Sequence, residues 1–317
     1  MSSQPTLICL MGPTASGKTD LAMRLAEHHL VEIVSVDSAL VYKGMDIGTG
    51  KPNANMLEKA PHHLINVCDP AVRYNAGQFR EDALKVIKEI ISRNHIPLLV
   101  GGTMMYFKAL LEGLAVLPPC DVKLRETLDV EAKMLGWPAL HNRLASVDPI
   151  CAARIKPTDA QRIQRALEVY ILSNKSLSDW IKESHLKQDS ELLPYQVHAI
   201  GFIPTMEQRK ILHGRIEQRF LKMLEAGFLA EVEHLFERSD LNLDTPSMRC
   251  VGYRQVWEYL LGYYNYETMK EKAMAATRQL AKRQITWLRS WPALIEIDFF
   301  NEKVTLDHCD KLIAKLK

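Results

Sequence analysis

The sequence predicts an α/β protein, with a parallel sheet flanked by helices and an inserted all-helical domain. Three observations predict this fold. Short apolar runs alternate with helical periodicity, each run closes on glycine or polar residues, and a polar segment without strand signals follows Pro118-Pro119. Since the strands are continuously apolar, we expect helices to cover both faces of the sheet.

The first elements are a strand, a helix and a second strand. Residues 7–11 are apolar and lead into GPTASGKT at 12–19, after which residues 18–30 show helical periodicity. Residues 31–36 are rich in β-branched side chains and close on Asp37. This order predicts that the glycine-containing loop and Asp37 both follow strands of one parallel sheet.

The next elements continue the pattern. Residues 78–93 place apolar side chains on one side, as an amphipathic helix does, and lead into IPLLV, which ends at Gly101-Gly102-Thr103. Residues 195–203 and 293–300 predict further strands of the same sheet. Because parallel strands expose their carboxyl ends at one edge, the polar residues that follow them should lie together.

A helical insertion interrupts the sheet. Residues 121–192 are polar and helical in pattern, without strand signals. Thr158 with Gln161 three positions later predicts a capping box, and an apolar stripe follows it. We expect an α/β core domain made of two segments, and one helical domain: 1–118 with 200–317, and 119–199.

Composition excludes several classes of protein. The net charge is +2, from 40 basic and 38 acidic side chains, so overall charge indicates no partner. The 6 cysteines are far apart and form no CxxC pair, which favours a reducing, cytoplasmic compartment over a disulfide or zinc framework. The first residues lack a signal-peptide pattern, and the most apolar stretch, 96–119, is broken by glycines and charges. We therefore expect no membrane association.

GPTASGKT matches the phosphate-binding loop (P-loop) pattern G-x-x-x-x-G-K-T and predicts a P-loop NTPase-like sheet. Backbone N–H groups and the following helix N-terminus bind anionic oxygens, Lys18 adds a charge, and the Thr19 hydroxyl usually completes a Mg²⁺ shell. The loop does not tell whether the bound phosphates belong to a nucleotide being cleaved. The candidate phosphate ligands are Gly12, Pro13, Thr14, Ala15, Ser16, Gly17, Lys18 and Thr19.

Asp37 and Thr103 follow the second and third strands. Asp37 suits a general base if it reaches the proton that it removes, and equally suits a helix cap or a second-shell acid near Mg²⁺. The Thr103 hydroxyl could touch a phosphate or leaving-group oxygen, whereas the preceding glycine pair is also typical of a simple tight turn. The residues alone leave both alternatives open, with the turn favoured for Thr103.

Arg215 and Arg219 lie four positions apart in RIEQRF, on one face of an expected helix. Neither has an acidic residue three or four positions away, so stacking two cations costs a few tenths of a kcal/mol. A solvated surface pair is the ordinary interpretation of this pattern. A diphosphate is the alternative, because arginine binds phosphate oxygens well.

Three basic segments carry the nucleic-acid signal. Residues 272–295 contain no acidic residue and include KRQITWLR at 282–289, while RCVGYR (249–254) and QRIQR (161–165) repeat the mixture of arginine with amide or aromatic groups. Basic side chains neutralise phosphates, and aromatic or guanidinium planes stack on bases. Each segment alone is typical of a solvated face. Three in a nearly neutral protein favour RNA.

Taken together, the chain resembles the tRNA dimethylallyltransferases, also called tRNA isopentenylpyrophosphate transferases. The likeness spans about 7–289, and GPTASGKT followed by VDSALVYKGMDIGT is highly specific. The matching segments, in the family's order, are GPTASGKT, SVDSALVYKGMDIGT, LLVGGTMMYFKALLEGL, QRIQRALEV, RIEQRF, RCVGYRQ and TRQLAKRQITWLR.

The resemblance implies a reaction. The dimethylallyl group of dimethylallyl diphosphate moves to the exocyclic amine of an adenine beside the tRNA anticodon, on its 3′ side, and diphosphate leaves. Asp37 would take the amine proton, while the P-loop amides, Lys18 and Thr19 with Mg²⁺ would bind the diphosphate. Thr103 would hydrogen-bond near the bridging oxygen or the adenine. Arg219, helped by Arg215, would clamp the diphosphate.

The resemblance also implies how tRNA binds. The adenine must flip out of the anticodon loop, and the helical insertion would grip the anticodon stem-loop. We expect a monomer. The positions that match the family's tRNA contacts are Asp37, Ser38, Ala39, Leu40, Thr103, Arg125, Gln161, Arg162, Ile163, Gln164, Arg165, Arg249, Cys250, Val251, Gly252, Tyr253, Arg254, Lys282, Arg283, Gln284, Ile285, Thr286, Trp287, Leu288 and Arg289.

Two other functions remain as alternatives. A small-molecule kinase on the same P-loop core would need an adenine pocket and usually an arginine-bearing lid, and neither has a signal here. It would also leave KRQITWLR unexplained. A non-catalytic RNA-binding or nucleotide-switch protein has no use for Asp37 beside an intact P-loop. Transfer of label from a prenyl donor or from ATP separates these functions.

Overall fold

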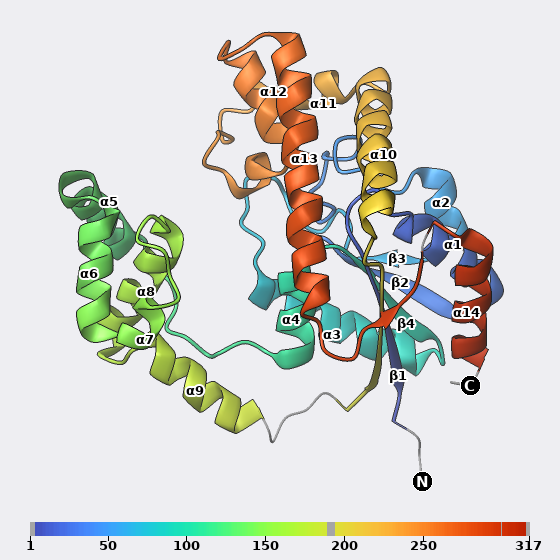
Figure 1. Cartoon of the computed structure of the whole chain (residues 1–317), viewed down its shortest axis with the longest axis horizontal. Coiled ribbons are helices and arrows are strands. Elements are labelled where there is room, and N and C mark those ends of the chain that lie inside the picture. Colours follow the sequence, from blue (N-terminus) through green and yellow to red (C-terminus); the bar gives the residue numbers. More distant parts are fainter. Residues whose placement is uncertain (1–3, 189–193, 299, 315–317) are drawn as a thin grey trace. The chain divides into compact units, whose positions relative to one another are not determined.

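A computed structural model describes residues 4–188, 194–298 and 300–314 (Figure 1). The chain divides into two compact units. One unit combines Met1–Leu111 with Pro194–Lys317, and the other is Glu112–Leu193. The first unit contains the sheet, and helices are the regular elements in the described part of the second.

The sheet has six strands in the order β3-β2-β4-β1-β5-β6, and every neighbouring pair is parallel. This confirms the predicted α/β fold with a parallel sheet. The order places β4 between β2 and β1, so the polar residues after these three strands share one edge. The strands are β1 (Thr6–Met11), β2 (Val31–Val36), β3 (His62–His63), β4 (Ile96–Gly101), β5 (Gln196–Gly201) and β6 (Ile295–Glu296).

Helices of the α/β unit cover both faces of this sheet and extend beyond its carboxyl edge (Figure 1). They are α1 (Lys18–His28), α2 (Ala54–Lys59), α3 (Ala76–Ser92), α4 (Met104–Glu112), α10 (Met206–Glu225), α11 (Phe228–Phe236), the 3-10 turn η1 (Pro246–Arg249), α12 (Tyr253–Leu260), α13 (Tyr266–Arg289) and α14 (Glu302–Ala314). The boundary residue Glu112 ends α4 and opens the helical unit.

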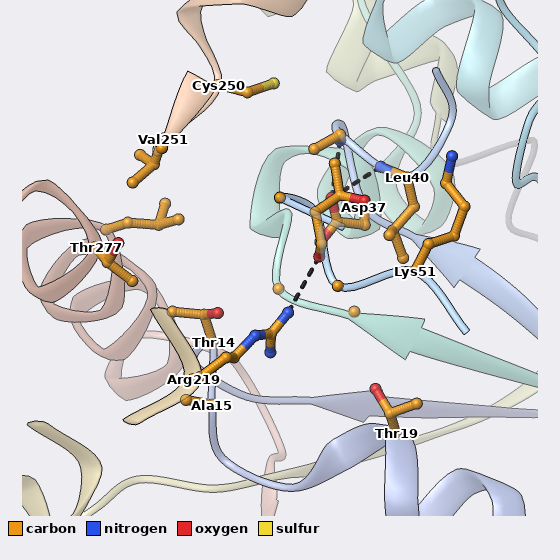
Figure 2. A pocket seen from close by; sticks show the side chains of 18 of the residues that line it. Thr14, Ala15, Thr19, Asp37, Leu40, Lys51, Arg219, Cys250, Val251 and Thr277 are labelled. Carbon is orange, nitrogen blue, oxygen red and sulfur yellow. Dashed lines mark hydrogen bonds between the residues drawn. The ribbon is translucent and has the colours of Figure 1, made fainter. Parts of the chain in front are cut away.

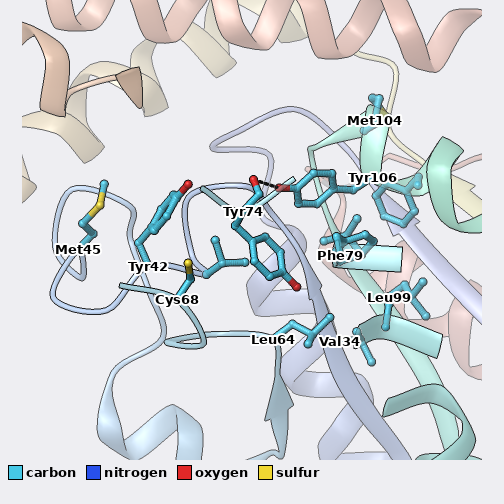
Figure 3. Packing of buried hydrophobic residues seen from close by; sticks show 14 of the residues in the cluster. Val34, Tyr42, Met45, Leu64, Cys68, Tyr74, Phe79, Leu99, Met104 and Tyr106 are labelled. Carbon is cyan, nitrogen blue, oxygen red and sulfur yellow. Dashed lines mark hydrogen bonds between the residues drawn. The ribbon is translucent and has the colours of Figure 1, made fainter. Parts of the chain in front are cut away.

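Alternation along the strands divides the core into two layers. Val34 and Leu99 point to the layer that contains Phe79 of α3 and Tyr106 of α4, whose rings stack with centroids 4.4 Å apart (Figure 3). Val31, Ile33 and Leu98 point to the opposite layer, under α1 and α14. Since each face of the sheet is covered, the strands read as continuous apolar runs.

The helical unit has its own apolar core, built from buried side chains such as Leu128, Leu144, Ile163 and Leu167. Its helices are α5 (Val122–Leu135), α6 (Trp137–Val147), α7 (Pro149–Ala152), α8 (Ala160–Ser173) and α9 (Leu177–Gln188). Within the described part of the chain, no helix is long and apolar enough to cross a membrane.

Two sequence predictions need correction. The capping box at Thr158 and Gln161 is wrong: α8 begins at Ala160, and the Asp159 side chain accepts from the Arg162 N–H at 3.3 Å. The cap thus lies one residue later than expected, and the Asp159 carboxylate performs it. The predicted strand at 293–300 is too long: among its described residues, only Ile295–Glu296 forms a strand, which pairs with β5.

Candidate active site

A cavity of about 1550 Å³ opens at the carboxyl edge of the sheet, and all of its lining residues belong to the α/β unit (Figure 2). P-loop residues 14–19, Asp37, Thr103, Arg215 and Arg219 all line it, whereas Gly12 and Pro13 of the loop are buried beside it. The structure therefore brings together the predicted catalytic and diphosphate-binding side chains, although the segments that carry them are far apart in the sequence.

The P-loop connects β1 to α1 and holds a backbone shape suited to anions. Ala15 and Gly17 have φ angles of 62° and 97°, in the left-handed region, and the helix begins directly at Lys18. Left-handed residues between right-handed ones turn successive N–H groups to one side, which makes a concave anion site. The helix N-terminus adds partial positive charge. The loop can bind phosphate oxygens through its backbone.

Lys18 stands at this loop with its ammonium group close to polar atoms. Its Nζ donates to the Pro13 carbonyl at 2.7 Å and lies 3.5 Å from Ser16 Oγ. Burial lowers the pKa of Lys18 to about 7, the Asp37 carboxylate opposes this shift, and the Arg219 guanidinium adds to it. An anion bound beside Lys18 would restore its charged form, so the site favours a negatively charged ligand.

Asp37 directly follows β2, and its two carboxylate oxygens have different surroundings. Oδ1 accepts from the Ala39 N–H at 2.8 Å and from the Leu40 N–H at 3.4 Å (Figure 2). Asp37 therefore does cap a turn, which was one of its two interpretations. Because Oδ1 is used for the turn, Oδ2 is the oxygen available to accept a substrate proton.

Thr103 follows the end of β4 and contacts the turn after Asp37. Its Oγ1 accepts from the Ser38 N–H at 3.0 Å, and its own N–H donates to the Val36 carbonyl at 3.2 Å. Gly101 leaves this approach possible, since a Cβ there would lie 2.0 Å from the Val36 carbonyl oxygen. Thr103 thus positions the segment that carries Asp37, in addition to lining the cavity.

Arg219 extends from α10 into the cavity (Figure 2). Its Nη2 donates to the Thr49 carbonyl at 3.1 Å, and burial lowers its pKa although Asp37 and Asp20 oppose the shift. Gly50 has a left-handed φ of 66° and leaves room for Arg219, because a Cβ there would lie 2.1 Å from the same Nη2. A backbone carbonyl leaves the positive charge of the guanidinium available to an anion.

The sequence indicates no internal partner for either arginine, but both have one. Besides the bond from Arg219 to Thr49, the Arg215 guanidinium lies over the Phe300 ring, 4.2 Å from its centroid. The sequence rule examined only neighbours on the same helix, whereas both partners come from distant segments. Arg215 is therefore held at the cavity wall by an aromatic ring.

The loop at 46–50 is a part of the site to which sequence reasoning assigned no role. Its backbone N–H groups at Asp46, Ile47 and Gly48 donate to the Glu231 carboxylate at 2.8, 2.7 and 3.0 Å. The Tyr253 hydroxyl donates to the same carboxylate, and burial together with this charge raises the pKa of Tyr253. Glu231 of α11 thereby fixes the loop whose carbonyl at Thr49 receives Arg219. Gly48 and Gly50, in and directly after the segment SVDSALVYKGMDIGT, were the sequence signal that could have indicated this loop.

The predicted tRNA-contact segments in the α/β unit have exposed and buried members. Cys250, Val251 and Gly252 line the cavity, and burial with the Asp37 charge raises the pKa of the Cys250 thiol to about 12. Ser38, Ala39 and Leu40 line it too. The exposed members of these segments are Arg249 and Arg283, which also line the cavity, and Arg254, Lys282, Thr286 and Arg289.

Four side chains of the segments predicted to contact tRNA are buried in the protein. Tyr253, Ile285 and Leu288 are buried in the α/β unit, and Ile163 is buried in the helical unit. They stand within matching segments, but helices in these segments bury one face, at a spacing of three or four residues. Gln284 is also buried, while Trp287 is partly exposed and lines the cavity.

In the helical unit, the predicted contact residues form an internal network around Glu168. This buried carboxylate accepts from Arg125 at 2.9 Å through both Nε and Nη2, and from Arg165. Gln164 donates to the Arg125 carbonyl at 3.2 Å and to Asp129. These side chains stabilise the unit, which leaves Gln161 and Arg162 as the exposed members of QRIQR.

Comparisons with known proteins agree with this geometry. A family model described as IPP transferase matches residues 40–291. The tRNA isopentenylpyrophosphate transferase from Bacillus halodurans is 32% identical with a TM-score of 0.70, covering 98% of this chain and 96% of that chain. The tRNA delta(2)-isopentenylpyrophosphate transferase from Staphylococcus epidermidis is 33% identical with a TM-score of 0.69, covering 98% and 99%.

A third solved structure shares the architecture at lower identity. It is a eukaryotic dimethylallyltransferase acting on tRNA, 26% identical with a TM-score of 0.75, and the match covers 90% of this chain and 70% of that chain. The family model begins after the P-loop and Asp37, whereas the two bacterial structures match nearly the whole chain.

Proposed function

The chain belongs to the IPP transferase family and prenylates tRNA, and we propose that it transfers a dimethylallyl group from dimethylallyl diphosphate. The acceptor is the exocyclic amine of the adenine next to the anticodon, on its 3′ side. One observation carries this proposal: a carboxylate with an available oxygen, Asp37, and two cations, Lys18 and Arg219, line the same cavity. A proton acceptor beside a diphosphate site suits attack by an amine.

The diphosphate of the donor binds to the P-loop. Backbone N–H groups of the loop donate to its oxygens, and Lys18 and Arg219 neutralise its charge. These cations also stabilise the negative charge that grows on the leaving oxygen as the carbon–oxygen bond breaks. Arg215 stands four residues before Arg219 on α10 and supplies a second guanidinium at the cavity wall.

A magnesium ion fits the residues at this loop. The Thr19 side chain is exposed at the cavity, and the described residues contain no cluster of three His, Cys, Asp or Glu side chains that could cage a metal. Mg²⁺ is commonly held by one or two protein oxygens together with substrate phosphates and water. Thr19 would hold it here, and the ion would supply further positive charge to the diphosphate.

Asp37 acts on the nucleophile. The amine nitrogen attacks the allylic carbon, the bond from that carbon to the diphosphate oxygen breaks, and its electron pair leaves with the diphosphate. Asp37 Oδ2 accepts the proton that the amine loses. Thr103 holds the turn after Asp37 in place through Ser38, so the carboxylate is positioned before substrate arrives.

The acceptor adenine reaches this cavity by leaving the anticodon stack. The cavity of about 1550 Å³ exceeds the roughly 300–1,000 Å³ of usual small-molecule pockets, which gives room for a donor and a flipped nucleotide together. Exposed basic residues of α13, such as Lys282 and Arg289, bind the RNA backbone. The helical unit grips the anticodon stem-loop. The separated cysteines suit a cytoplasmic enzyme.

One assay tests the proposal. The protein is incubated with unmodified tRNA, Mg²⁺, ATP labelled at the γ-phosphate, and dimethylallyl diphosphate labelled in the prenyl group. We expect the prenyl label to appear in tRNA and the phosphate label to stay in ATP. Transfer of phosphate to a small molecule, without prenylated tRNA, would contradict the proposal. A small-molecule kinase is not favoured, since the family and the structural matches concern prenyl transfer.

Asp37→Asn tests the proton acceptor in the same assay. The variant retains the Oδ1 contacts to the turn but lacks a basic oxygen, so tRNA binding should persist while turnover falls by about 10²–10⁴-fold. Turnover at the wild-type rate would show that Asp37 is not the base. Raising the salt concentration should weaken tRNA binding far more than donor binding, because only the RNA contact releases many counterions.

A further inference from the structure

The side chain of Gln284 connects two segments of the cavity wall. Gln284 lies in α13 and is 8% exposed. Its Oε1 accepts from the Thr14 N–H at 2.9 Å, and its Nε2 donates to the Gly102 carbonyl at 2.9 Å. Both polar ends of the amide are therefore bonded to backbone groups, and neither end is free to read a base.

The two backbone groups belong to the two halves of the proposed chemistry. Thr14 stands in the P-loop, directly before Ala15 with its left-handed φ of 62°. Gly102 directly precedes Thr103, whose Oγ1 holds the Ser38 N–H next to Asp37. One amide side chain thus fixes the diphosphate-binding loop relative to the segment that positions the proton acceptor.

The fit around this amide is tight. A Cβ at position 102 would lie 2.2 Å from Gln284 Nε2, so the contact with the carbonyl requires glycine there. Buried polar groups that are fully hydrogen-bonded define one geometry, because losing a partner is costly. The arrangement fixes the distance between α13 and the edge of the sheet at the site itself.

Helix α13 therefore has two faces with different roles. Lys282, Arg283 and Thr286 are exposed, whereas Ala281, Gln284, Ile285 and Leu288 are buried at the spacing of one helix face. The exposed face carries the charge expected to bind RNA. The buried face carries one polar side chain, and it is directed at the P-loop.

We propose that Gln284 is a positioning residue for the diphosphate-binding loop and not a tRNA contact. The proposal rests on the proposed function of the cavity as the donor site. Without the Gln284 side-chain amide, the P-loop loses its link to Gly102. The loop is then less ordered, so it binds the donor diphosphate less tightly and holds the allylic carbon farther from Asp37. Donor binding and turnover depend on Gln284, and tRNA affinity does not.

The test uses the full-length protein with Gln284→Met, which keeps the length of the side chain and removes both polar atoms. Gln284→Asn is a second variant, with the same groups on a shorter stem. Ser290→Ala is the matched control, because this exposed hydroxyl bonds to the Trp287 carbonyl of its own helix. Lys282→Ala supplies the opposite contrast on the exposed face.

Two dissociation constants are measured: the Kd of inorganic pyrophosphate with Mg²⁺ by calorimetry and the Kd of unmodified tRNA by filter binding. Steady-state kinetics give kcat and the KM of each substrate. For Gln284→Met we expect the pyrophosphate Kd to rise about tenfold and the tRNA Kd to stay within about twofold. Lys282→Ala should do the reverse, and Ser290→Ala should change neither quantity.

A raised tRNA Kd with an unchanged pyrophosphate Kd would overturn the proposal, and so would two unchanged values. If Gln284→Met does not fold, the same comparison is made with Gln284→Asn, for which the same outcomes hold. Pyrophosphate binding needs no prenyl transfer. A wild-type protein that binds pyrophosphate without prenylating tRNA would thus count against the proposed function alone, and an active enzyme indifferent to Gln284 against this inference alone.

Discussion

The backbone N–H of Ser38 donates to Thr103 Oγ1 at 3.0 Å, and this bond joins the turn after β2 to the residue that follows β4. The same turn is capped by Asp37 Oδ1 through Ala39 and Leu40. The backbone N–H groups of its own turn therefore fix the Asp37 carboxylate, and Thr103 fixes that turn through Ser38. Its position depends on a hydroxyl that a glycine pair alone would not supply.

Thr103→Val should separate positioning from binding. Valine keeps the shape of threonine but cannot accept from Ser38, so the turn with Asp37 shifts, and a displacement near 1 Å at a reacting group lowers kcat by about 10–100-fold. The tRNA Kd should change little. Thr103→Ser retains the oxygen and serves as the control. A wild-type kcat in Thr103→Val would show that the hydrogen bond does not matter.

From the lowered pKa of Lys18, we predict that donor binding depends on pH. Its pKa in the free protein is about 7, and a bound diphosphate raises this pKa because it favours the ammonium form. Binding above pH 7 then takes up a proton, so affinity is highest below pH 7 and falls by at most about tenfold per pH unit above it. The measurement is the Kd of pyrophosphate between pH 6 and 9.

Lys18→Arg is the control for this pH profile. Its guanidinium stays charged throughout the range, so any remaining pH dependence belongs to the ligand itself. The wild-type profile should fall more steeply than that of the variant. Parallel profiles would contradict a titrating Lys18.

Glu231 should control donor binding without touching the donor. Glu231→Gln places an amide NH₂ against the N–H groups of Asp46, Ile47 and Gly48, so the loop that receives Arg219 at Thr49 is displaced. Because bonds to a charged group contribute about 1.5–3 kcal/mol each, we expect the KM of the donor to rise at least about tenfold.

Tyr253→Phe should raise the KM of the donor by less than Glu231→Gln does. It removes only the hydroxyl bond to Glu231 and leaves the three backbone bonds, so its donor KM should lie between the values of the wild type and Glu231→Gln. Steady-state kinetics with tRNA held at saturation give the comparison. A larger effect from Tyr253→Phe than from Glu231→Gln would contradict this order.

From the lowered pKa of Glu32, we predict how acid destabilises the α/β unit. The bond from Arg93, at 2.9 and 2.8 Å, lowers the pKa of Glu32 to about 2, His63 adds to the shift, and burial opposes it. A depressed carboxyl pKa stabilises the fold above the unfolded value of 4.5, and this contribution disappears as the pH falls towards 2. At pH 7 it is on the order of 3 kcal/mol.

Glu32→Gln should therefore lower the free energy of unfolding at pH 7, and the difference from the wild type should shrink between pH 5 and pH 2. Urea unfolding at several pH values measures it. Glu27→Gln, a change at an exposed glutamate of α1, is the control and should have little effect. A difference that grows towards low pH would contradict the assignment.

Local signals predicted most of the sheet and the loop. The apolar runs at 7–11, 31–36 and 96–100 are β1, β2 and the main part of β4, and the P-loop lies between a strand and a helix as expected. These features could be predicted because each depends on residues that are close in sequence. Burial of a strand or of one helix face produces a recognisable pattern of apolar residues within a short segment. The strand at 293–300 failed for the opposite reason. Its pairing depends on β5, nearly a hundred residues earlier, and only two residues meet it.

Contacts between distant segments could not be predicted. Glu231 meets the loop at 46–48 across a separation of 185 residues for Asp46, and no local pattern marks that contact. The bond from Arg219 to Thr49 and the stacking of Arg215 on Phe300 are of the same kind. The sequence showed two cations on one helix face, and tertiary packing supplied their neighbours.

The sequence by itself determined the P-loop, the carboxylate at the end of β2 and the basic character of α13, since each follows from residues that are adjacent in the chain. Tertiary structure alone decided which face of α13 is buried. Helical periodicity groups Gln284 with Ile285 and Leu288, but only packing against the sheet directs that face inward. Gln284 then meets Thr14, 270 residues earlier, because the fold brings α13 to the end of β1.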